Sequence, residues 1–297
     1  MTNKRVLFII NPISGTGNKL KVEHLIKTKC EGMLNFDIKY TEAPLHGKQI
    51  AAEAKTQYDA VVAVGGDGTI NEIAQSLIDS DCHMGIIPLG SGNGLARHLK
   101  IPLNTEKAIE NIINFNSSII DTGSINDQFF VNVAGVGFDA FVAHKFAEAK
   151  GRGFRTYAHI ITKEFPKYKP LRINLEVDNT IITNTFFMIT IANSSQFGNN
   201  AFISPNASLC DGLFNVVMLR KFPLITSPVL AGLLFTKKID LFQYVQNITG
   251  KKIVIEKKGE ICAQIDGEPV TFTDKIVIEN KALSLKIITP EKYNDKL

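Results

Sequence analysis

Three glycine-bearing turns in the first hundred residues contain the groups that could bind phosphate. Their sequences are NPISGTG (residues 11–17), GGDGT (65–69) and LGSGNG (89–94). Glycine lets backbone N–H groups approach an anion because no Cβ stands in the way. A helix that starts at such a turn adds unpaired N–H groups and a partial positive charge. Together the three turns predict a polyphosphate site.

A single glycine turn is weak evidence, because a tight connection between two elements also needs glycine. Three such turns, one with an embedded acid, favour phosphate binding over three unrelated connections. The sequence contains no GxxxxGK[ST] motif, and no GxGxxG opens the first helix. The pattern therefore offers glycine turns without a P-loop lysine.

Asp67 lies inside the second turn, where its charge would repel phosphate unless a divalent cation lies between them. Magnesium binds through few carboxylates together with waters and phosphates, which suits a lone aspartate. We therefore expect Asp67 to belong to a magnesium network. Thr69 and Asn71 follow at the start of a helix, where the Thr69 hydroxyl either caps the first turn or binds phosphate. Both interpretations stay open.

The elements that must position these turns alternate between strands and helices. Apolar, mostly β-branched runs predict strands at residues 6–10, 36–40, 60–64 and 84–88, and helix-period segments lie near 19–31, 47–57, 70–79, 95–99 and 105–115. This alternation indicates βαβ units and a parallel sheet. Ligands of such sheets bind outside the carboxyl ends of the strands, where all three turns lie.

After residue 121 the pattern changes to closely spaced strands with alternating side chains. We expect them at 172–177, 186–193, 213–219, 251–257, 260–266, 274–280 and 283–289, with helical stretches around 139–165 and 224–247. Such strands are typical of an antiparallel sandwich or barrel. The expected fold class is α/β, with a parallel-sheet nucleotide-binding domain over residues 1–122. An antiparallel β-sandwich domain follows over 123–289, with the active cleft between the two.

Composition excludes several classes of protein. The 297 residues carry a formal net charge of +4, which gives no reason to expect a nucleic-acid partner. The four cysteines include no CxxC pair, which indicates a reduced cytoplasmic protein. The longest apolar stretch, residues 222–235, falls short of the roughly 20 residues that span a bilayer, so we expect a soluble protein. The sequence has no HExxH and no GxSxG, which disfavours metal-hydrolase and serine-hydrolase chemistry.

The three turns, in this order and spacing, resemble the catalytic domain of the diacylglycerol kinase and sphingosine kinase superfamily, particularly its soluble bacterial lipid kinases. Later segments agree, namely NVAGVGFDA (132–140), ISPNASLCDGLFNVV (203–217) and IDGEP (265–269). The resemblance covers nearly the whole chain. It implies ATP as donor, Mg²⁺ as cofactor, and a membrane lipid such as diacylglycerol or a sphingoid base as acceptor. It also implies that the tail, residues 290–297, returns to the first domain.

Carried over by position, the resemblance places nucleotide contacts in four segments of this chain. They are Asn11, Pro12, Ser14 and Gly15; then Thr41; then Gly65, Gly66, Asp67, Gly68, Thr69, Ile70 and Asn71; and lastly Ser91. The resemblance also assigns Asp67 and Asp121 to the metal-water network around Mg-ATP.

The resemblance further implies a general base within residues 266–268. A carboxylate within hydrogen-bond reach can accept the proton of the lipid hydroxyl as it attacks phosphorus. We prefer Glu268, with Asp266 second; without the resemblance, Asp266 and Gly267 would be interpreted as a hairpin turn.

A second metal site is implied at Ser208, Asp211 and Leu213, with Asp211 as the ionic ligand and the other two residues binding through backbone oxygens. A plain turn aspartate is the alternative interpretation of Asp211.

Residues 144–170 contain seven basic residues against two acids, with aromatic residues interleaved. This pattern suits either an anionic membrane surface or a solvated helix face. The predicted function is an ATP-dependent lipid kinase, cytoplasmic and peripheral at the inner membrane surface. An NAD kinase-like phosphotransferase and a catalytically inactive nucleotide- or lipid-binding module are the alternatives. Whether the chain forms a homodimer stays open.

Overall fold

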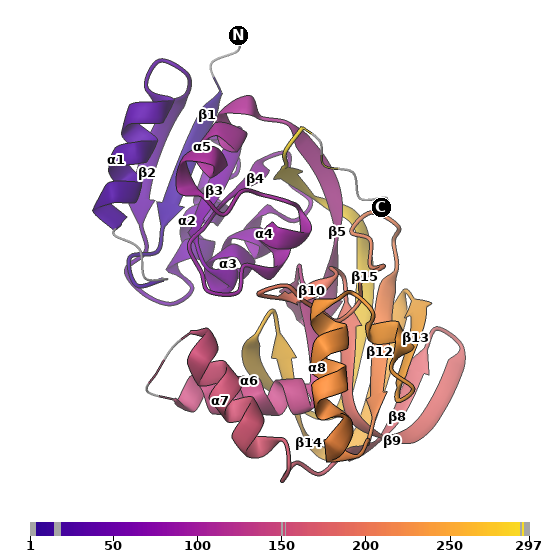
Figure 1. Ribbon diagram of the computed structural model, residues 1–297. Coiled ribbons are helices and arrows are strands. Elements are labelled where there is room, and N and C mark those ends of the chain that lie inside the picture. Colours follow the sequence, from indigo (N-terminus) through magenta and orange to yellow (C-terminus); the bar gives the residue numbers. More distant parts are fainter. Residues whose placement is uncertain (1–3, 15–18, 150, 152, 292, 294–297) are drawn as a thin grey trace. The chain divides into compact units, whose positions relative to one another are not determined.

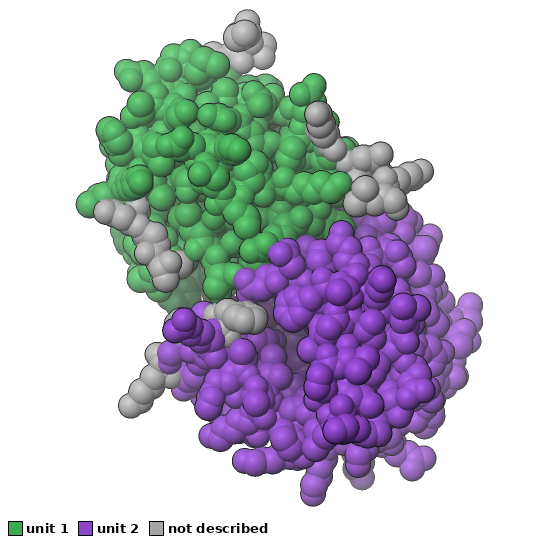
Figure 2. All heavy atoms as spheres, in the orientation of Figure 1, with its two compact units in different colours: residues 1–121, 283–297 green, residues 122–282 purple. Residues whose placement is uncertain are grey.

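The computed structural model describes residues 4–14, 19–149, 151, 153–291 and 293. The chain divides into two compact units (Figure 2). Unit 1 comprises residues 1–121 together with 283–297, and unit 2 comprises residues 122–282. The chain therefore passes from unit 1 into unit 2 and comes back.

Unit 1 is built on a parallel sheet whose strand order is β15-β4-β3-β1-β2. Strand β1 (Arg5–Ile10) lies between β2 (Asn35–Tyr40) and β3 (Ala60–Gly65), and β3 also pairs with β4 (His83–Pro88). The last residues of β15 (Glu268–Ile288) join β4 in parallel through Ile287 and Met84. Every residue of β3 is buried, as expected for a strand that is covered on both faces.

Helices cover both faces of this sheet because successive side chains of a strand point to opposite sides. Helices α1 (Lys19–Cys30) and α5 (Thr105–Asn114) pack on the face that carries Phe8 and Val62. Helices α2 (His46–Ala54) and α3 (Asp67–Leu77) contact each other and strands β1, β3 and β4. A short helix, α4 (Gly94–His98), follows β4. Figure 1 shows these elements.

Unit 2 is antiparallel and is organised around the long strand β9 (Thr180–Ala192). It pairs with β12 (Phe214–Arg220), β7 (Val133–Gly137) and β8 (Leu171–Val177). Strand β14 (Lys252–Ile265) pairs with β7, β8 and β15, and β13 (Val245–Gly250) pairs with β12. Strand β5 (Ser117–Ile125) runs from unit 1 into unit 2 and pairs with β6 (Gln128–Phe130). A separate ribbon joins β10 (Gln196–Gly198) and β11 (Ala201–Phe202).

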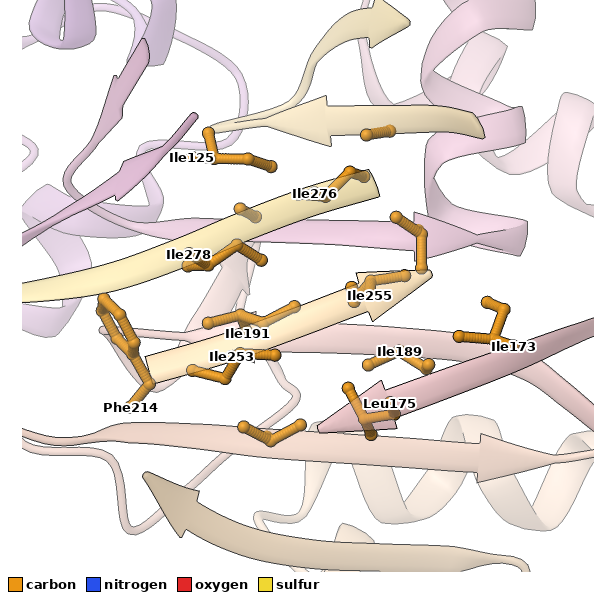
Figure 3. Packing of buried hydrophobic residues seen from close by; sticks show 14 of the residues in the cluster. Ile125, Ile173, Leu175, Ile189, Ile191, Phe214, Ile253, Ile255, Ile276 and Ile278 are labelled. Carbon is orange, nitrogen blue, oxygen red and sulfur yellow. The ribbon is translucent and has the colours of Figure 1, made fainter. Parts of the chain in front are cut away.

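The sandwich interior is filled by isoleucine, valine, leucine and phenylalanine side chains from both layers. In Figure 3, Leu175 of β8, Ile189 of β9 and Ile255 of β14 belong to one cluster with Phe214. These strands alternate inward apolar and outward polar residues, as the burial pattern of β8 shows. The predicted fold class, an N-terminal α/β domain followed by an antiparallel β-sandwich domain, is therefore confirmed.

Helices of unit 2 pack on an aromatic cluster outside the sandwich interior. They are α6 (Phe138–Glu148), α7 (Phe154–Glu164) and α8 (Ser227–Phe235), with single 3₁₀ turns η1 (Leu224–Thr226) and η2 (Ile239–Leu241) on either side of α8. The Phe187 ring lies 4.8 Å from that of Phe138 and 5.5 Å from that of Phe222. Among the helices in the described ranges, none combines the length and apolar character needed to cross a bilayer.

Several predicted boundaries were wrong. The strands expected at 251–257 and 260–266 form the single strand β14, which has a register shift between Glu256 and Glu260. The helical stretch expected up to residue 247 ends earlier, because β13 begins at Val245 and completes the sheet beside β12. The return to unit 1 begins at Leu283, so residues 283–289 lie with unit 1 and not with the sandwich.

Candidate functional site

The first two glycine turns are joined by a side-chain hydrogen bond at the carboxyl edge of the unit 1 sheet. Asn11, directly after β1, donates from Nδ2 to Oγ1 of Thr69 at 2.9 Å. Thr69 is only 4% exposed and lies in the first turn of α3. A Cβ at Gly65 would lie 2.6 Å from the Thr69 hydroxyl oxygen, so the glycine makes room for this contact. The Thr69 hydroxyl thus links two turns in addition to standing at a helix start.

The second and third turns approach each other at two glycines. A Cβ at Gly90 would lie 2.7 Å from the Cα of Gly66, a backbone atom that cannot rotate away. The backbone N–H of Leu89 also donates to the carbonyl oxygen of Gly65 at 2.7 Å. We call the assembly of Asn11, residues 65–69 and residues 90–94 the glycine-turn site.

Asp67 braces the third turn. Its two carboxylate oxygens accept hydrogen bonds from the backbone N–H groups of Asn93 and Gly94, each at 2.9 Å. These N–H groups open α4, where a carboxylate also interacts favourably with the helix dipole. Asn93 has a φ of 52°, a left-handed conformation that asparagine tolerates better than most residues. Sequence reasoning missed the parts played by Asn93 and Gly90, although the Asn-Gly pair of LGSGNG was a signal for such a turn.

The other predicted nucleotide residues fall into three groups. Ser14 donates to the Asn11 carbonyl at 3.0 Å, and the Thr41 N–H donates to the Ile10 carbonyl at 3.0 Å, so both lie beside the end of β1. Pro12 and Ser91 are exposed and Gly68 is half-buried. The side chains of Ile70 and Asn71 are buried in α3. The Asn71 amide oxygen accepts a hydrogen bond from Gln75. The apolar Ile70 could contact a polar ligand only through its backbone. Gly15 lies outside the described residues.

Lys19, the first residue of α1, is a cation that sequence reasoning did not single out. Its Nζ atom is inaccessible to solvent and has no hydrogen-bond partner within the part of the chain that the structure describes. Burial lowers the pKa of this ammonium. In a parallel α/β sheet the helix that follows a strand begins at the strand's carboxyl edge. Lys19 is therefore a candidate phosphate ligand of the same edge.

Asp266 and Glu268, the two candidate bases, have opposite environments in unit 2. Asp266 is buried, and its carboxylate accepts hydrogen bonds from three consecutive backbone N–H groups, those of Val131, Asn132 and Val133, at 2.9–3.0 Å. Glu268 is exposed. Asp266 and Gly267 both have positive φ, 50° and 90°, and form the two-residue type I′ turn between β14 and β15.

A series of buried hydrogen bonds connects this turn to helix α6. The Gly267 N–H donates to Oε1 of Gln264 at 2.8 Å, and Nε2 of Gln264 donates to Oδ2 of Asp139 at 3.3 Å. Burial raises the pKa of the Asp139 carboxyl to about 7. Asp139 lies in the first turn of α6 and also accepts from the backbone N–H of Ala140 at 2.8 Å. Sequence reasoning quoted the segment that holds Asp139 but gave this residue no part.

Comparison with known families gives two matches that together span most of the chain. The model of the diacylglycerol kinase catalytic domain matches residues 5–125. The model described as the YegS C-terminal NAD kinase beta sandwich-like domain matches residues 132–287, more than half of the chain. A diacylglycerol kinase of Mycobacterium tuberculosis is 31% identical over 242 residues, which cover 74% of this chain and 78% of the relative. The chain belongs to the diacylglycerol kinase family. As a member it is a lipid kinase, a phosphotransferase.

Other members of the diacylglycerol kinase family and solved structures agree. A diacylglycerol kinase of Bacillus subtilis is 28% identical over 73% of this chain and 74% of the relative. A crystal structure of a diacylglycerol kinase from Bacillus anthracis shares the fold with a TM-score of 0.76 at 17% identity, covering 99% of this chain and all of that chain. An NAD kinase from Archaeoglobus fulgidus, solved in complex with ATP, has a TM-score of 0.55 at 16% identity, covering 97% and 95%.

The two metal sites that the diacylglycerol kinase resemblance implied have different surroundings. No group of three or more His, Cys, Asp or Glu side chains that could hold a metal occurs among the residues described. Magnesium needs only one or two carboxylates when phosphates and waters supply its other ligands, so the half-buried Asp67 fits it. Asp121 is fully buried and accepts from the Leu283 N–H at 2.7 Å, where β15 returns to unit 1.

At the second implied site, Asp211 is exposed and accepts from the Leu213 N–H at 3.0 Å, while the Ser208 hydroxyl accepts from the Cys210 N–H at 3.2 Å. These contacts are those of an Asx turn. They fit the turn interpretation of Asp211, and the metal site stays a prediction, because the second carboxylate oxygen takes no part in these contacts.

Proposed function

We propose that this lipid kinase transfers the γ-phosphoryl group of ATP to the hydroxyl of a membrane lipid, with diacylglycerol as the first candidate acceptor. The observation that supports this most is the glycine-turn site, in which three turns at one sheet edge are tied together by Asn11, Thr69 and Asp67. The relatives named diacylglycerol kinase support the acceptor.

The donor would bind through main-chain N–H groups of the turns and through Lys19. The Lys19 ammonium is inaccessible to solvent and has no hydrogen-bond partner among the described residues, which is unfavourable, and a phosphate oxygen would supply an anion for it. When bound, Mg²⁺ would neutralise charge that grows on the phosphoryl oxygens. Asp67 would hold that ion through water while its carboxylate keeps α4 in place.

Glu268 is the base in this proposal. Three backbone N–H donors already engage the buried Asp266 carboxylate, which gives this acid a structural part in the turn. The exposed Glu268 carboxylate would take the proton of the lipid hydroxyl. The lipid oxygen then bonds to the γ-phosphorus, the bond from that phosphorus to the bridging oxygen breaks, and ADP leaves.

An NAD kinase-like activity is the second candidate, because the C-terminal family model and the Archaeoglobus fulgidus structure share that fold. An inactive nucleotide- or lipid-binding module is the third. The glycine-turn site would bind ATP in both kinase candidates, so the acceptor decides between those two. A sphingoid base also remains an alternative lipid acceptor.

The test is transfer of label from γ-labelled ATP with diacylglycerol, sphingosine or NAD offered in separate reactions. We expect labelled lipid with diacylglycerol and none in the Glu268→Gln variant. Label on NAD alone would replace the proposal with the second candidate. Tight ATP binding without a labelled product in any reaction would establish the third.

A further inference from the structure

The segment around α8 exposes an unusual amount of apolar surface. In α8 itself, residues 227–235, only Leu230 is buried, and the segment from Phe222 to Thr236 contains no charged residue. Both η1 and η2 contact α8, so the three pieces are neighbours in space. We define the α8 surface by its exposed large apolar residues: Leu224 (51% exposed), Ile225 (86%), Val229 (55%), Phe235 (51%) and Leu241 (73%).

This surface differs from the outer face of an ordinary helix. A helix at the surface of a globular protein turns an apolar stripe inward and carries polar residues outside. Helix α8 buries Leu230 against the aromatic cluster, as the ordinary case requires, but its outer face is apolar as well. Contiguous exposed apolar patches of this kind mark interaction sites. Figure 1 labels α8 among the helices of the chain.

Basic residues flank η1 and α8 in the sequence. Arg220 and Lys221 precede η1, Lys237 and Lys238 follow α8, and all four are exposed. The one acid between residues 220 and 241 is Asp240, so the formal charge of this stretch is four minus one, or +3. Asp240 already accepts from the Asn206 and Asn247 side chains. Apolar residues flanked by Lys and Arg match the chemistry of an anionic bilayer, where alkyl side chains enter the acyl region and basic groups meet the headgroups.

We propose that the α8 surface docks this protein onto an anionic lipid bilayer. The helix has nine residues, so it lies in the interface and does not span. This inference rests on the proposed function in one respect, that the acceptor lipid resides in a bilayer. It places the membrane contact at α8, whereas the sequence pattern had suggested residues 144–170.

A second copy of this chain is the competing occupant. Stable dimers usually bury about 800 Å² on each partner, contributed by about 20–30 residues. The α8 surface has five large exposed apolar residues, and the four exposed basic residues of the same stretch would repel their counterparts in a symmetric pair. An anionic bilayer would instead attract these basic residues.

The experiment measures co-sedimentation of the protein with vesicles of phosphatidylglycerol and phosphatidylcholine in equal parts, without ATP or diacylglycerol. Ile225→Ser removes the most exposed residue of the surface, and Ile181→Ser is its matched control. Ile181 of β9 is another isoleucine of unit 2 and is 72% exposed. We expect Ile225→Ser to weaken binding about tenfold or more and Ile181→Ser to leave it unchanged. Binding should also fall with added salt and in the Lys237→Gln/Lys238→Gln variant.

Equal binding by the two serine variants, or equal binding to vesicles of phosphatidylcholine alone, would overturn the proposal. So would a dimer in solution that Ile225→Ser dissociates, because the second copy would then be the occupant. Activity on a short-chain diacylglycerol dispersed without a bilayer separates the two hypotheses. Ile225→Ser should keep that activity, whereas a wild-type protein that binds vesicles but phosphorylates no lipid would refute only the proposed function.

Discussion

The pair Asp266 and Glu268 offers a direct test of how the structure divides two neighbouring acids into a structural and a reactive one. The isosteric variants Asp266→Asn and Glu268→Gln each remove one negative charge and little volume. Asp266 accepts three backbone N–H bonds in a buried turn, whereas Glu268 is exposed. The first variant should therefore lose stability, and the second should lose turnover.

The magnitude for Asp266→Asn follows from its three contacts. If the amide oxygen replaces Oδ1, the bonds from Asn132 and Val133 persist, but each loses the contribution of the charge, about 1 kcal/mol. The amide NH₂ then faces the Val131 N–H, which is left without an acceptor at a cost of about 1–3 kcal/mol. The sum is about 3–5 kcal/mol. For Glu268→Gln, an exposed site, the change should stay within about 0.5 kcal/mol.

Urea unfolding followed by far-UV circular dichroism measures these stabilities, since the chain has no tryptophan to report by fluorescence. Steady-state kinetics at saturating ATP gives the second readout. We expect Glu268→Gln to lower kcat by about 10²–10⁴-fold with an unchanged unfolding midpoint. An Asp266→Asn variant of wild-type stability whose only defect is in kcat would contradict this reasoning and make Asp266 the base.

Three further predictions address other parts of the two units. Asp67→Ala should lower the free energy of unfolding by about 2 kcal/mol, because two charge-assisted hydrogen bonds to the start of α4 are lost from a half-buried site. It should also abolish phosphoryl transfer. An unchanged midpoint of urea unfolding would argue against a structural part for Asp67. Lys19→Met should raise the KM for ATP about tenfold, because a phosphate contact is lost. Stability should be kept or improved, since the change removes an inaccessible ammonium that has no partner in the described chain. An unchanged KM would exclude a phosphate contact. Asp139 has a folded-state pKa of about 7 against an ordinary 3.8, so the folded state holds this proton more tightly and the protein loses stability as pH rises between these values. The free energy of unfolding of Asp139→Asn, taken relative to that of the wild type, should therefore rise by about 3 kcal/mol from pH 5 to pH 8. If the unfolding free energies of the two proteins changed with pH in parallel, the assignment would be refuted.

Much of unit 1 could be predicted from the sequence because its elements contrast strongly. Strands such as β3 are apolar at every position, helices such as α3 follow a 3.6-residue period, and glycine marks the junctions. The same contrast located the three turns at one sheet edge, since parallel strands share their carboxyl edge. The links within the site, such as that between Asn11 and Thr69, join residues 58 positions apart and left no mark in the local pattern.

Unit 2 was harder to predict because its strands are long and bent. The register shift near residue 258 interrupts the alternation of β14, so one strand resembled two. The apolar run at residues 222–235 was ambiguous in another way, since a helix that is apolar on all sides gives no sign of which face packs. Only the structure shows Leu230 buried and Ile225 exposed.

Three of the acids that the family resemblance singled out share a property that no local pattern contains. Asp67, Asp121 and Asp266 each accept backbone N–H groups from a segment distant in sequence, by 26 residues for Asp67 and Asn93 and by 162 for Asp121 and Leu283. Each carboxylate therefore holds a backbone segment in place, whatever it also does for a metal or a proton. An alanine at any of these positions would impair architecture and chemistry together, and lost activity alone would not identify a ligand or a base. Isosteric amides measured for both stability and rate separate the two, because a carboxylate used only in chemistry, as we expect for Glu268, should leave the unfolding midpoint where it was.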